Sequence, residues 1–194
     1  GSADQSVRDR LLDVAEEMFS AQDFEAVSVR ELTERAGVTY SAVYHYFGDK
    51  RGLFIASYVR RLAEVSRRLR ASLKIGATPE ERIWSFMLEQ CRVHREPGAM
   101  RMVQRQSIGG DREVMHAVAD RTGFAQQIDE LIAEIAQVCG PEQAPRRAID
   151  LYVMPFGYTA IGPIFDAIDR LATPPESVAD HARYVLGRVL PERD

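Results

Sequence analysis

The most constraining feature of the sequence is a stretch of twenty residues, Ser28 to Phe47, that predicts two short helices joined by a tight turn. Ser28 with Glu31 three residues later is a capping-box pattern, which is typical of a helix start. Gly37 follows where that helix must end, because glycine adopts the left-handed conformation at little cost. Thr39 can then cap a second short helix. This spacing is typical of a helix-turn-helix unit, whose second helix can enter the major groove of DNA.

Helical patterns continue along the rest of the chain, and no stretch shows the alternation expected of a strand. Apolar residues follow one face of a helix that begins near Val7, and Asp49 can cap a long helix that ends at Gly76. Thr78 followed by proline and two acids is a strong start pattern for the next helix. We therefore expect an all-α fold of about nine helices.

Three further helices are expected in the C-terminal half. One should run from Asp111 to about Val138, and the last should start at Thr173 and carry an apolar stripe. The third expected helix lies between these two and spans residues 146–171. Pro155 and Pro163 should kink or divide it, because proline lacks a backbone N–H.

Composition and charge narrow the class of protein. The chain has 194 residues, of which 45% are apolar, and a net charge of −4, so any nucleic-acid surface must be local. Residues 35–51 hold three bases and one acid, although residues 5–60 as a whole are net negative. Two cysteines, Cys91 and Cys139, are too few for a disulfide framework, so a reduced, cytoplasmic compartment is expected. The longest uncharged stretch, 151–165, is shorter than the roughly 20 residues that a bilayer requires, so no membrane partner is expected.

Enzyme motifs are missing from the sequence. There is no Gly-x-Ser-x-Gly, phosphate loop, His-Glu-x-x-His or dinucleotide fingerprint, so we expect neither an enzyme nor a cofactor. Cys91 and His94 stand three residues apart on a helix and could share a metal ion, but no second pair of this kind is close in the sequence. A metal-sensing regulator is therefore kept only as an alternative.

The second helix of the helix-turn-helix unit predicts the contact surface. Its exposed side chains should include Thr39, Tyr40, Ser41, Tyr44 and His45, whose hydroxyls and rings can touch phosphates, base edges and thymine methyls. Lys50 follows at a helix start, where free amides and the helix dipole also favour a phosphate.

Residues 7–54 resemble the N-terminal domain of the TetR family of repressors. The resemblance rests on Ser28, Ala36-Gly37-Val38-Thr39, Tyr44-His45-Tyr46-Phe47 and Lys50-Arg51-Gly52-Leu53, which stand at the spacing of that family. It implies that phosphates are held by Ser28, Thr39, Tyr44, Tyr46 and Lys50. It also implies that Tyr40, Ser41 and His45 lie near bases, with Ser41 standing where many members have glycine.

The resemblance further implies two domains. Residues 5–52 would form the three-helix DNA-binding domain, and residues 53–190 a larger helical domain for ligand binding and dimerisation. Its last two helices would pack against their mates in a homodimer, and the apolar stretches 151–165 and 178–189 fit that role.

A small, mainly apolar effector is expected in the larger domain. Methionine, aromatic and aliphatic side chains that could line its site, or form an ordinary core instead, are Trp84, Met87, Cys91, Met100, Met102, Val103, Phe124, Ile128, Tyr152 and Phe156. The prediction is a ligand-responsive, sequence-specific DNA-binding regulator, a repressor that its effector releases from a palindromic operator. The alternatives are a metal-sensing repressor and a helical interaction protein that does not bind DNA.

Overall fold

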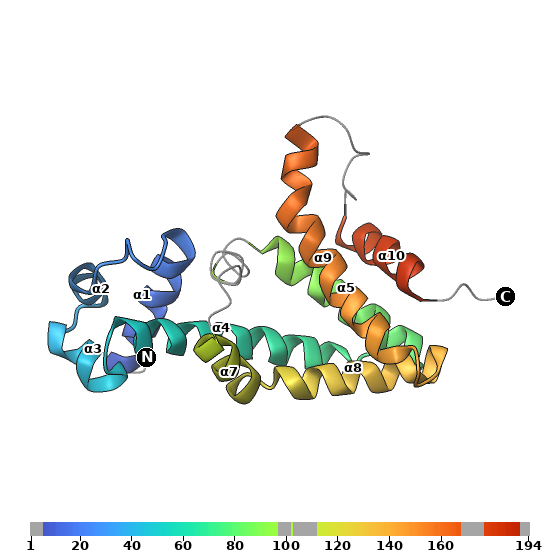
Figure 1. Cartoon of the computed structure of the whole chain (residues 1–194), viewed down its shortest axis with the longest axis horizontal. Helices are drawn as coiled ribbons and strands as arrows, with labels where there is room; N and C mark the ends of the chain where they lie inside the picture. Colours follow the sequence, from blue (N-terminus) through green and yellow to red (C-terminus); the bar gives the residue numbers. More distant parts are fainter. Residues whose placement is uncertain (1–5, 97–101, 103–111, 168–176, 191–194) are drawn as a thin grey trace, which may run out of the picture. The chain divides into compact units, whose positions relative to one another are not determined.

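A computed structural model describes residues 6–96, 102, 112–167 and 177–190. Within those ranges the chain forms nine helices and no strand, so the all-α prediction is confirmed. The helices are α1 (Val7–Ala21), α2 (Val29–Ala36), α3 (Tyr40–Phe47), α4 (Lys50–Ser72), α5 (Pro79–Arg95), α7 (Arg112–Arg121), α8 (Phe124–Cys139), α9 (Ala144–Ala167) and α10 (Val178–Val189) (Figure 1). None of these described helices is long and apolar enough to span a membrane.

Several helix ends lie where the sequence predicts them. Gly37 ends α2 in the left-handed conformation, with φ of 62°. Thr78 and Glu81 form a complete capping box at the start of α5, in which each side chain accepts from the other residue's backbone N–H. Asp49 accepts a hydrogen bond from the backbone N–H of Gly52 at 2.7 Å in the first turn of α4.

Other expectations were wrong. The single helix expected from Asp111 to about Val138 is replaced by two, α7 and α8, because Gly123 adopts a φ of 72° between them. Of the two outcomes expected for Pro155 and Pro163, a kink or a division, division does not occur, because α9 runs as one helix from Ala144 to Ala167. Pro155 is buried, and the packing of α9 against α5 and α8 offsets the lost hydrogen bond. The start expected at Thr173 lies outside the described residues, and α10 begins after Ser177.

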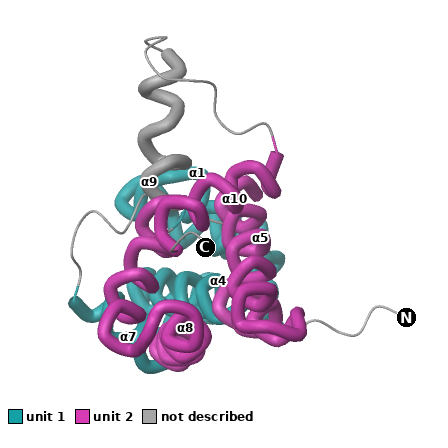
Figure 2. Tube along the Cα trace, turned by 90° about the vertical axis from the view of Figure 1, so that its right-hand side faces the viewer, with its two compact units in different colours: residues 1–64, 97–122 teal, residues 65–96, 123–194 magenta. Residues whose placement is uncertain are grey.

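The chain divides into two compact units, shown in different colours in Figure 2. Unit 1 comprises residues 1–64 and 97–122, and unit 2 comprises residues 65–96 and 123–194. The boundary falls inside α4, so the two ends of this continuous helix belong to different units.

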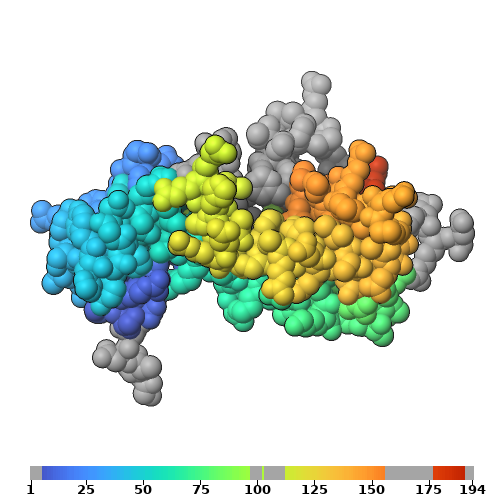
Figure 3. All heavy atoms as spheres, turned by 60° about the horizontal axis from the view of Figure 1, so that its bottom comes forward, coloured from blue at the N-terminus to red at the C-terminus, as the bar shows by residue number. Residues whose placement is uncertain are grey.

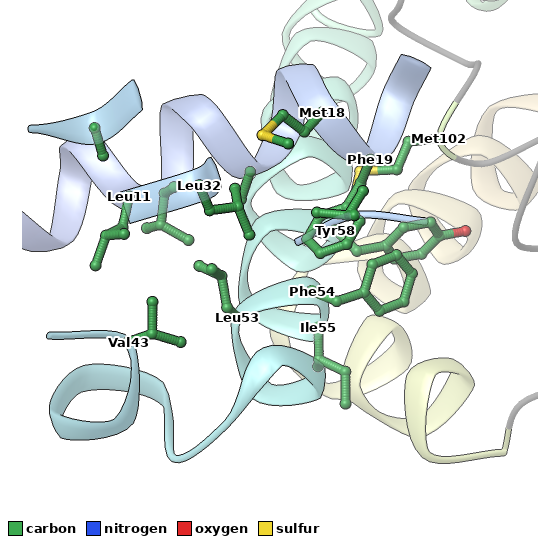
Figure 4. Packing of buried hydrophobic residues seen from close by; sticks show 14 of the residues in the cluster. Leu11, Met18, Phe19, Leu32, Val43, Leu53, Phe54, Ile55, Tyr58 and Met102 are labelled. Carbon is green, nitrogen blue, oxygen red and sulfur yellow. The ribbon is translucent and has the colours of Figure 1, made fainter. Parts of the chain in front are cut away.

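The core of unit 1 holds the helix-turn-helix helices in place. Leu11 and Phe19 of α1 pack with Leu32, Val43 and Leu53, all at most 1% exposed (Figure 4). Burying a large apolar side chain contributes about 1.5–3 kcal/mol, so this shared core fixes α2 and α3 against α1 and the start of α4. The ring of Phe19 also lies edge-on to Phe54, at 5.1 Å between centroids.

Unit 2 is a packed set of helices in which α5 contacts α8, α9 and α10 (Figure 1). Its apolar core includes Ile83, Phe86, Met87, Leu131, Ile135 and Leu151. Ion pairs tie the end of α4 to its neighbours: Arg68 donates to Glu89 of α5 at 2.7 Å, and Arg70 donates to Glu130 of α8 at 2.6 Å.

Candidate nucleic-acid interface

Helix α3 has one buried face and one exposed face. Ala42 and Val43 lie in the core of unit 1, and Val43 is fully buried. Three tyrosines of the same helix, Tyr40, Tyr44 and Tyr46, are 53%, 46% and 44% exposed. Three large rings on an eight-residue helix form an amphipathic surface that can stack on and hydrogen-bond to a partner. Ser41 and His45 are exposed on the same helix, as the sequence predicts.

The polar side chains of this face are joined in pairs. The hydroxyl oxygens of Tyr40 and Tyr44 are 2.9 Å apart, and their ring centroids are 5.3 Å apart. The hydroxyls of Thr39 and Ser41 lie 3.1 Å apart. These contacts restrict the rotamers of four exposed side chains before any partner binds, which lowers the entropy cost of recognition.

Two hydroxyl residues stand at helix starts without capping them. Ser28 precedes α2 and Thr39 precedes α3, yet neither side chain bonds to an amide of the helix that follows. The capping box predicted at Ser28 is therefore not formed, and the first amides of α2 have no cap from this side chain. Exposed hydroxyls and first-turn amides together are suited to phosphate oxygens.

Lys50 begins α4, but its ammonium group is not extended into solvent. Its Nζ lies 4.5 Å from the centroid of the Phe24 ring and donates to the carbonyl of Glu25 at 3.3 Å. Partial burial lowers the pKa of Lys50, and the nearby charge of Glu25 acts in the opposite direction. A phosphate contact by Lys50 would have to replace this weak backbone hydrogen bond. Arg51 is paired with Glu113 of α7 at 3.0 Å.

Gly52 is a residue whose role the sequence patterns missed. A Cβ atom at this position would lie 2.0 Å from the carbonyl oxygen of Phe47. Glycine therefore allows the start of α4 to pack closely under the end of α3, which sets the direction in which α3 projects.

A cleft in unit 1 borders the same helices. Its volume is about 550 Å³, and α7, yellow-green in Figure 3, contributes one wall. Its lining residues are Arg8, Tyr46, Phe47, Gly52, Ile55, Ala56, Glu113, His116, Ala117, Asp120 and Arg121. Charges of both signs line it, so the cleft shows no preference for a cation or an anion.

The residues expected to line an effector site are distributed around unit 2. Met87 and Cys91 are fully buried in α5, and Ile128 of α8 is half-buried. Phe124 and Tyr152 lie together, with ring centroids 5.6 Å apart, whereas Trp84 lies under the guanidinium of Arg183 of α10 at 5.9 Å.

The remaining expected lining residues cannot be placed in unit 2. Met102 belongs to the core of unit 1 instead, because it packs with the residues of α1 and α4. Met100 and Val103 lie outside the described residues, as does the side chain of Phe156.

The pair proposed for a metal ion has little capacity to bind one. Burial raises the pKa of the Cys91 thiol to about 11, which disfavours the thiolate that a metal requires. Among the residues that the structure describes, no three histidine, cysteine or acidic side chains gather into a metal site.

Comparison with known proteins shows a likeness in the N-terminal part of the chain. The model for bacterial regulatory proteins of the tetR family matches residues 11–57, which cover α2, α3, most of α1 and the start of α4. The regulator BetI of Rhizobium meliloti is 36% identical over 76 residues. Within residues 11–57 the chain therefore resembles the tetR family of regulators. The transcriptional repressor KstR of Mycobacterium tuberculosis is 31% identical over 86 residues. The relatives are named as transcriptional regulators and not as enzymes.

The matched sequence spans only part of these relatives. It covers 39% of this chain and 37% of BetI, and 44% of this chain and 39% of KstR. Likeness of fold extends further: FadR of Bacillus subtilis, solved in complex with stearoyl-CoA, covers 93% of this chain and 96% of its own at a TM-score of 0.71. Because the sequence identity is 12%, this likeness concerns the fold alone.

Proposed function

We propose that this protein is a member of the TetR family and a ligand-responsive transcriptional repressor that binds a palindromic DNA operator. The observation that carries the proposal is the exposed face of α3, where three tyrosines, a serine and a histidine project from a helix that the core of unit 1 holds rigidly. Residues 5–52 would bind DNA, and residues 53–190 would bind the effector and a second copy of the chain.

The proposed contacts divide into two groups. Ser28, Thr39, Tyr44, Tyr46 and Lys50 bind phosphates and thereby set the position of α3 in the major groove. Tyr40, Ser41 and His45 lie at base edges and determine the preferred sequence. The exposed hydroxyls at the starts of α2 and α3 support the first group, and the exposure of Tyr40 at the first position of α3 supports the second.

The short length of α3 supports a homodimer. An eight-residue helix contacts too few bases for useful specificity, so two copies must be held by symmetry. Ile149 and Val153, one turn apart on α9, are 62% and 58% exposed, and Tyr184 of α10 is 48% exposed. Exposed apolar side chains on neighbouring helices support α9 and α10 as the dimer surface.

The effector response is proposed to act through α4. The start of α4 carries Lys50 and packs under α3, while Arg68 and Arg70 near its end are ion-paired to α5 and α8. A mainly apolar molecule that moves α5 or α8 would therefore move α4. The two α3 helices of a dimer must fit successive major grooves about 34 Å apart. A small rotation of α4 would change their separation and so weaken operator binding. The effector must bind more tightly to the dimer whose two α3 helices no longer match the grooves. By thermodynamic linkage, DNA must then weaken effector binding by the same factor.

The test is a gel shift with the full chain and genomic fragments that include the region upstream of its own gene. Specific retention of one fragment, competed by the same duplex and not by a scrambled one, is expected. Apolar metabolites and drugs are then screened for release of that fragment. Failure to retain any fragment would favour a helical interaction protein over a DNA-binding regulator.

A further inference from the structure

Two glutamines lie inside unit 2, where polar side chains are costly to bury. Gln90 of α5 and Gln127 of α8 are each 1% exposed. The amide nitrogen of Gln90 donates to the backbone carbonyl of Leu151 at 3.1 Å, and the amide of Gln127 contacts the hydroxyl of Tyr152. Each glutamine thus reaches α9 from a different neighbouring helix.

The amide oxygens of both glutamines have no hydrogen-bond partner among the residues that the structure describes. The orientation of the Gln90 amide is fixed by chemistry, because the carbonyl of Leu151 can only accept and must therefore face the amide nitrogen. A buried acceptor left unpaired costs about 1–3 kcal/mol. The arrangement is therefore suited to a bound group that donates a hydrogen bond.

Aromatic rings adjoin the two amides. The ring of Tyr152 lies 5.7 Å from that of Phe86 and 5.6 Å from that of Phe124, both in edge-on geometry. Phe86 stands one turn before Gln90 on α5, and Phe124 stands one turn before Gln127 on α8. Edge-on ring clusters of this kind favour a further ring.

The charge around these groups argues against an anionic ligand. No lysine or arginine is buried in the part of the chain that the structure describes. Burial lowers the pKa of His94, whose Nδ1 lies 2.8 Å from the carbonyl oxygen of Gln90, so this imidazole is neutral at neutral pH. Burial also raises the pKa of Tyr152, so its hydroxyl keeps its proton.

We propose that Gln90, Gln127 and Tyr152, together with the rings of Phe86 and Phe124, form a binding site for a neutral aromatic molecule that carries a hydroxyl group. The hydroxyl donates to the amide oxygen of Gln90, and the ring packs edge-on against the aromatic side chains. This assignment rests on the proposed function, because it gives a location and a chemical class to the effector. Phe86, Gln90 and Gln127 were not among the lining residues expected from the sequence.

A competing explanation is that a buried water molecule satisfies both amide oxygens and that the glutamines serve only the fold. The two explanations differ in their response to a ligand series. We propose calorimetric titration of the full chain with 4-propylphenol, its methyl ether 4-propylanisole, and 4-propylbenzoate. The phenol has a donor and no charge, the ether lacks the donor, and the benzoate is an anion.

The phenol should bind at least about tenfold more tightly than the ether, and the benzoate should bind no better than the ether. In Gln90→Leu the affinity for the phenol should fall to that for the ether, while the affinity for the ether should stay the same. Gln127→Leu gives a second variant at the site. Gln137→Leu, a glutamine on the exposed side of α8, is the matched control and should keep the wild-type preference.

Three results with the wild-type chain would overturn the assignment. These are equal affinity for the phenol and the ether, tighter binding of the benzoate, and no binding of any of the three. If Gln90→Leu still binds the phenol more tightly than the ether, the amide of Gln90 does not bind the hydroxyl, and a buried water molecule is its partner instead. Operator affinity is measured separately with each probe. Phenol binding that depends on Gln90 but leaves the operator bound would contradict the proposed effector response while the site itself stands.

Discussion

The hydroxyl oxygens of Tyr40 and Tyr44 lie 2.9 Å apart on the exposed side of α3. One phenol must donate to the other, so the pair retains one proton that is free for a partner. The hydrogen bond to Tyr40 raises the pKa of Tyr44, so this phenol remains protonated. The pair therefore presents two linked rings and one directed donor to whatever α3 contacts.

Removing one of these hydroxyls should affect base recognition more than phosphate binding. In Tyr40→Phe we expect a two- to tenfold loss of operator affinity, roughly one hydrogen bond, with the salt dependence of binding unchanged. Fluorescence anisotropy with operator and scrambled duplexes measures both quantities. Ser85→Ala, which removes a side-chain hydroxyl from α5 outside the proposed DNA and dimer surfaces, is the control. A steeper or shallower salt dependence without a change in sequence preference would place Tyr40 at phosphates instead.

Gly52→Ala should destabilise the protein. A Cβ at residue 52 would meet the carbonyl of Phe47 at 2.0 Å, so α3 or α4 must shift, at a cost of about 1–3 kcal/mol or more. The matched control is Gly187→Ala in α10, where a Cβ meets nothing within 4 Å and alanine is the better helix former. Thermal unfolding should show a lower melting temperature for the first variant and an equal or higher one for the second. Equal melting temperatures for both variants would contradict the close packing.

The exposed apolar side chains of α9 and α10 should matter for assembly. Val153→Glu places a charge where the dimer surface is proposed, and sedimentation should show a shift from dimer to monomer at micromolar concentration. Met115→Glu, at an equally exposed position of α7, should leave the dimer intact. A monomeric wild-type chain, or a Val153→Glu variant that remains dimeric, would contradict this surface.

Acid should destabilise the chain through His181. This side chain is 1% exposed, and burial, with Arg95 and His94 nearby, lowers its pKa to about 4. Between the ordinary pKa near 6.5 and 4, only the unfolded chain binds the proton, so stability is full above about pH 6.5 and is lost as the pH falls. The loss is on the order of 3 kcal/mol, since each pH unit corresponds to about 1.4 kcal/mol per proton.

The check is the melting temperature between pH 7 and pH 4.5. It should fall less steeply in His181→Leu than in the wild type, and His116→Leu, at an exposed position of α7, should follow the wild type. If His181→Leu keeps the wild-type slope, the titration of His181 does not contribute.

The local features of the fold could be predicted because their causes are local. Gly37 ends α2 and Thr78 starts α5 for reasons that lie within four residues of each, and the exposed face of α3 follows from its periodicity. Gly123 was overlooked because a single glycine inside a long helical pattern is compatible with both a continuous and a broken helix. The family resemblance extended this prediction to the roles of individual side chains.

The buried polar groups could not be predicted in the same way. Gln90 and Gln127 stand on helices with mixed polar and apolar residues, and nothing in their spacing separates them from exposed glutamines such as Gln137. Their burial depends on α9, a segment that is distant in the sequence, packing against both helices at once. The contact of Lys50 with the ring of Phe24 is likewise a tertiary feature, because the two residues flank the whole helix-turn-helix unit.

The salt dependence of DNA binding tests most directly whether the surface from Ser28 to Lys50 binds DNA. Affinities of the wild type, Lys50→Ala and the control Lys74→Ala are measured by anisotropy on operator and random duplexes across a range of salt concentrations. Lys74 is exposed just beyond the far end of α4. We predict that Lys50→Ala weakens binding to both duplexes and lowers the salt slope by about one unit, while Lys74→Ala matches the wild type. An unchanged affinity and slope in Lys50→Ala would contradict the account.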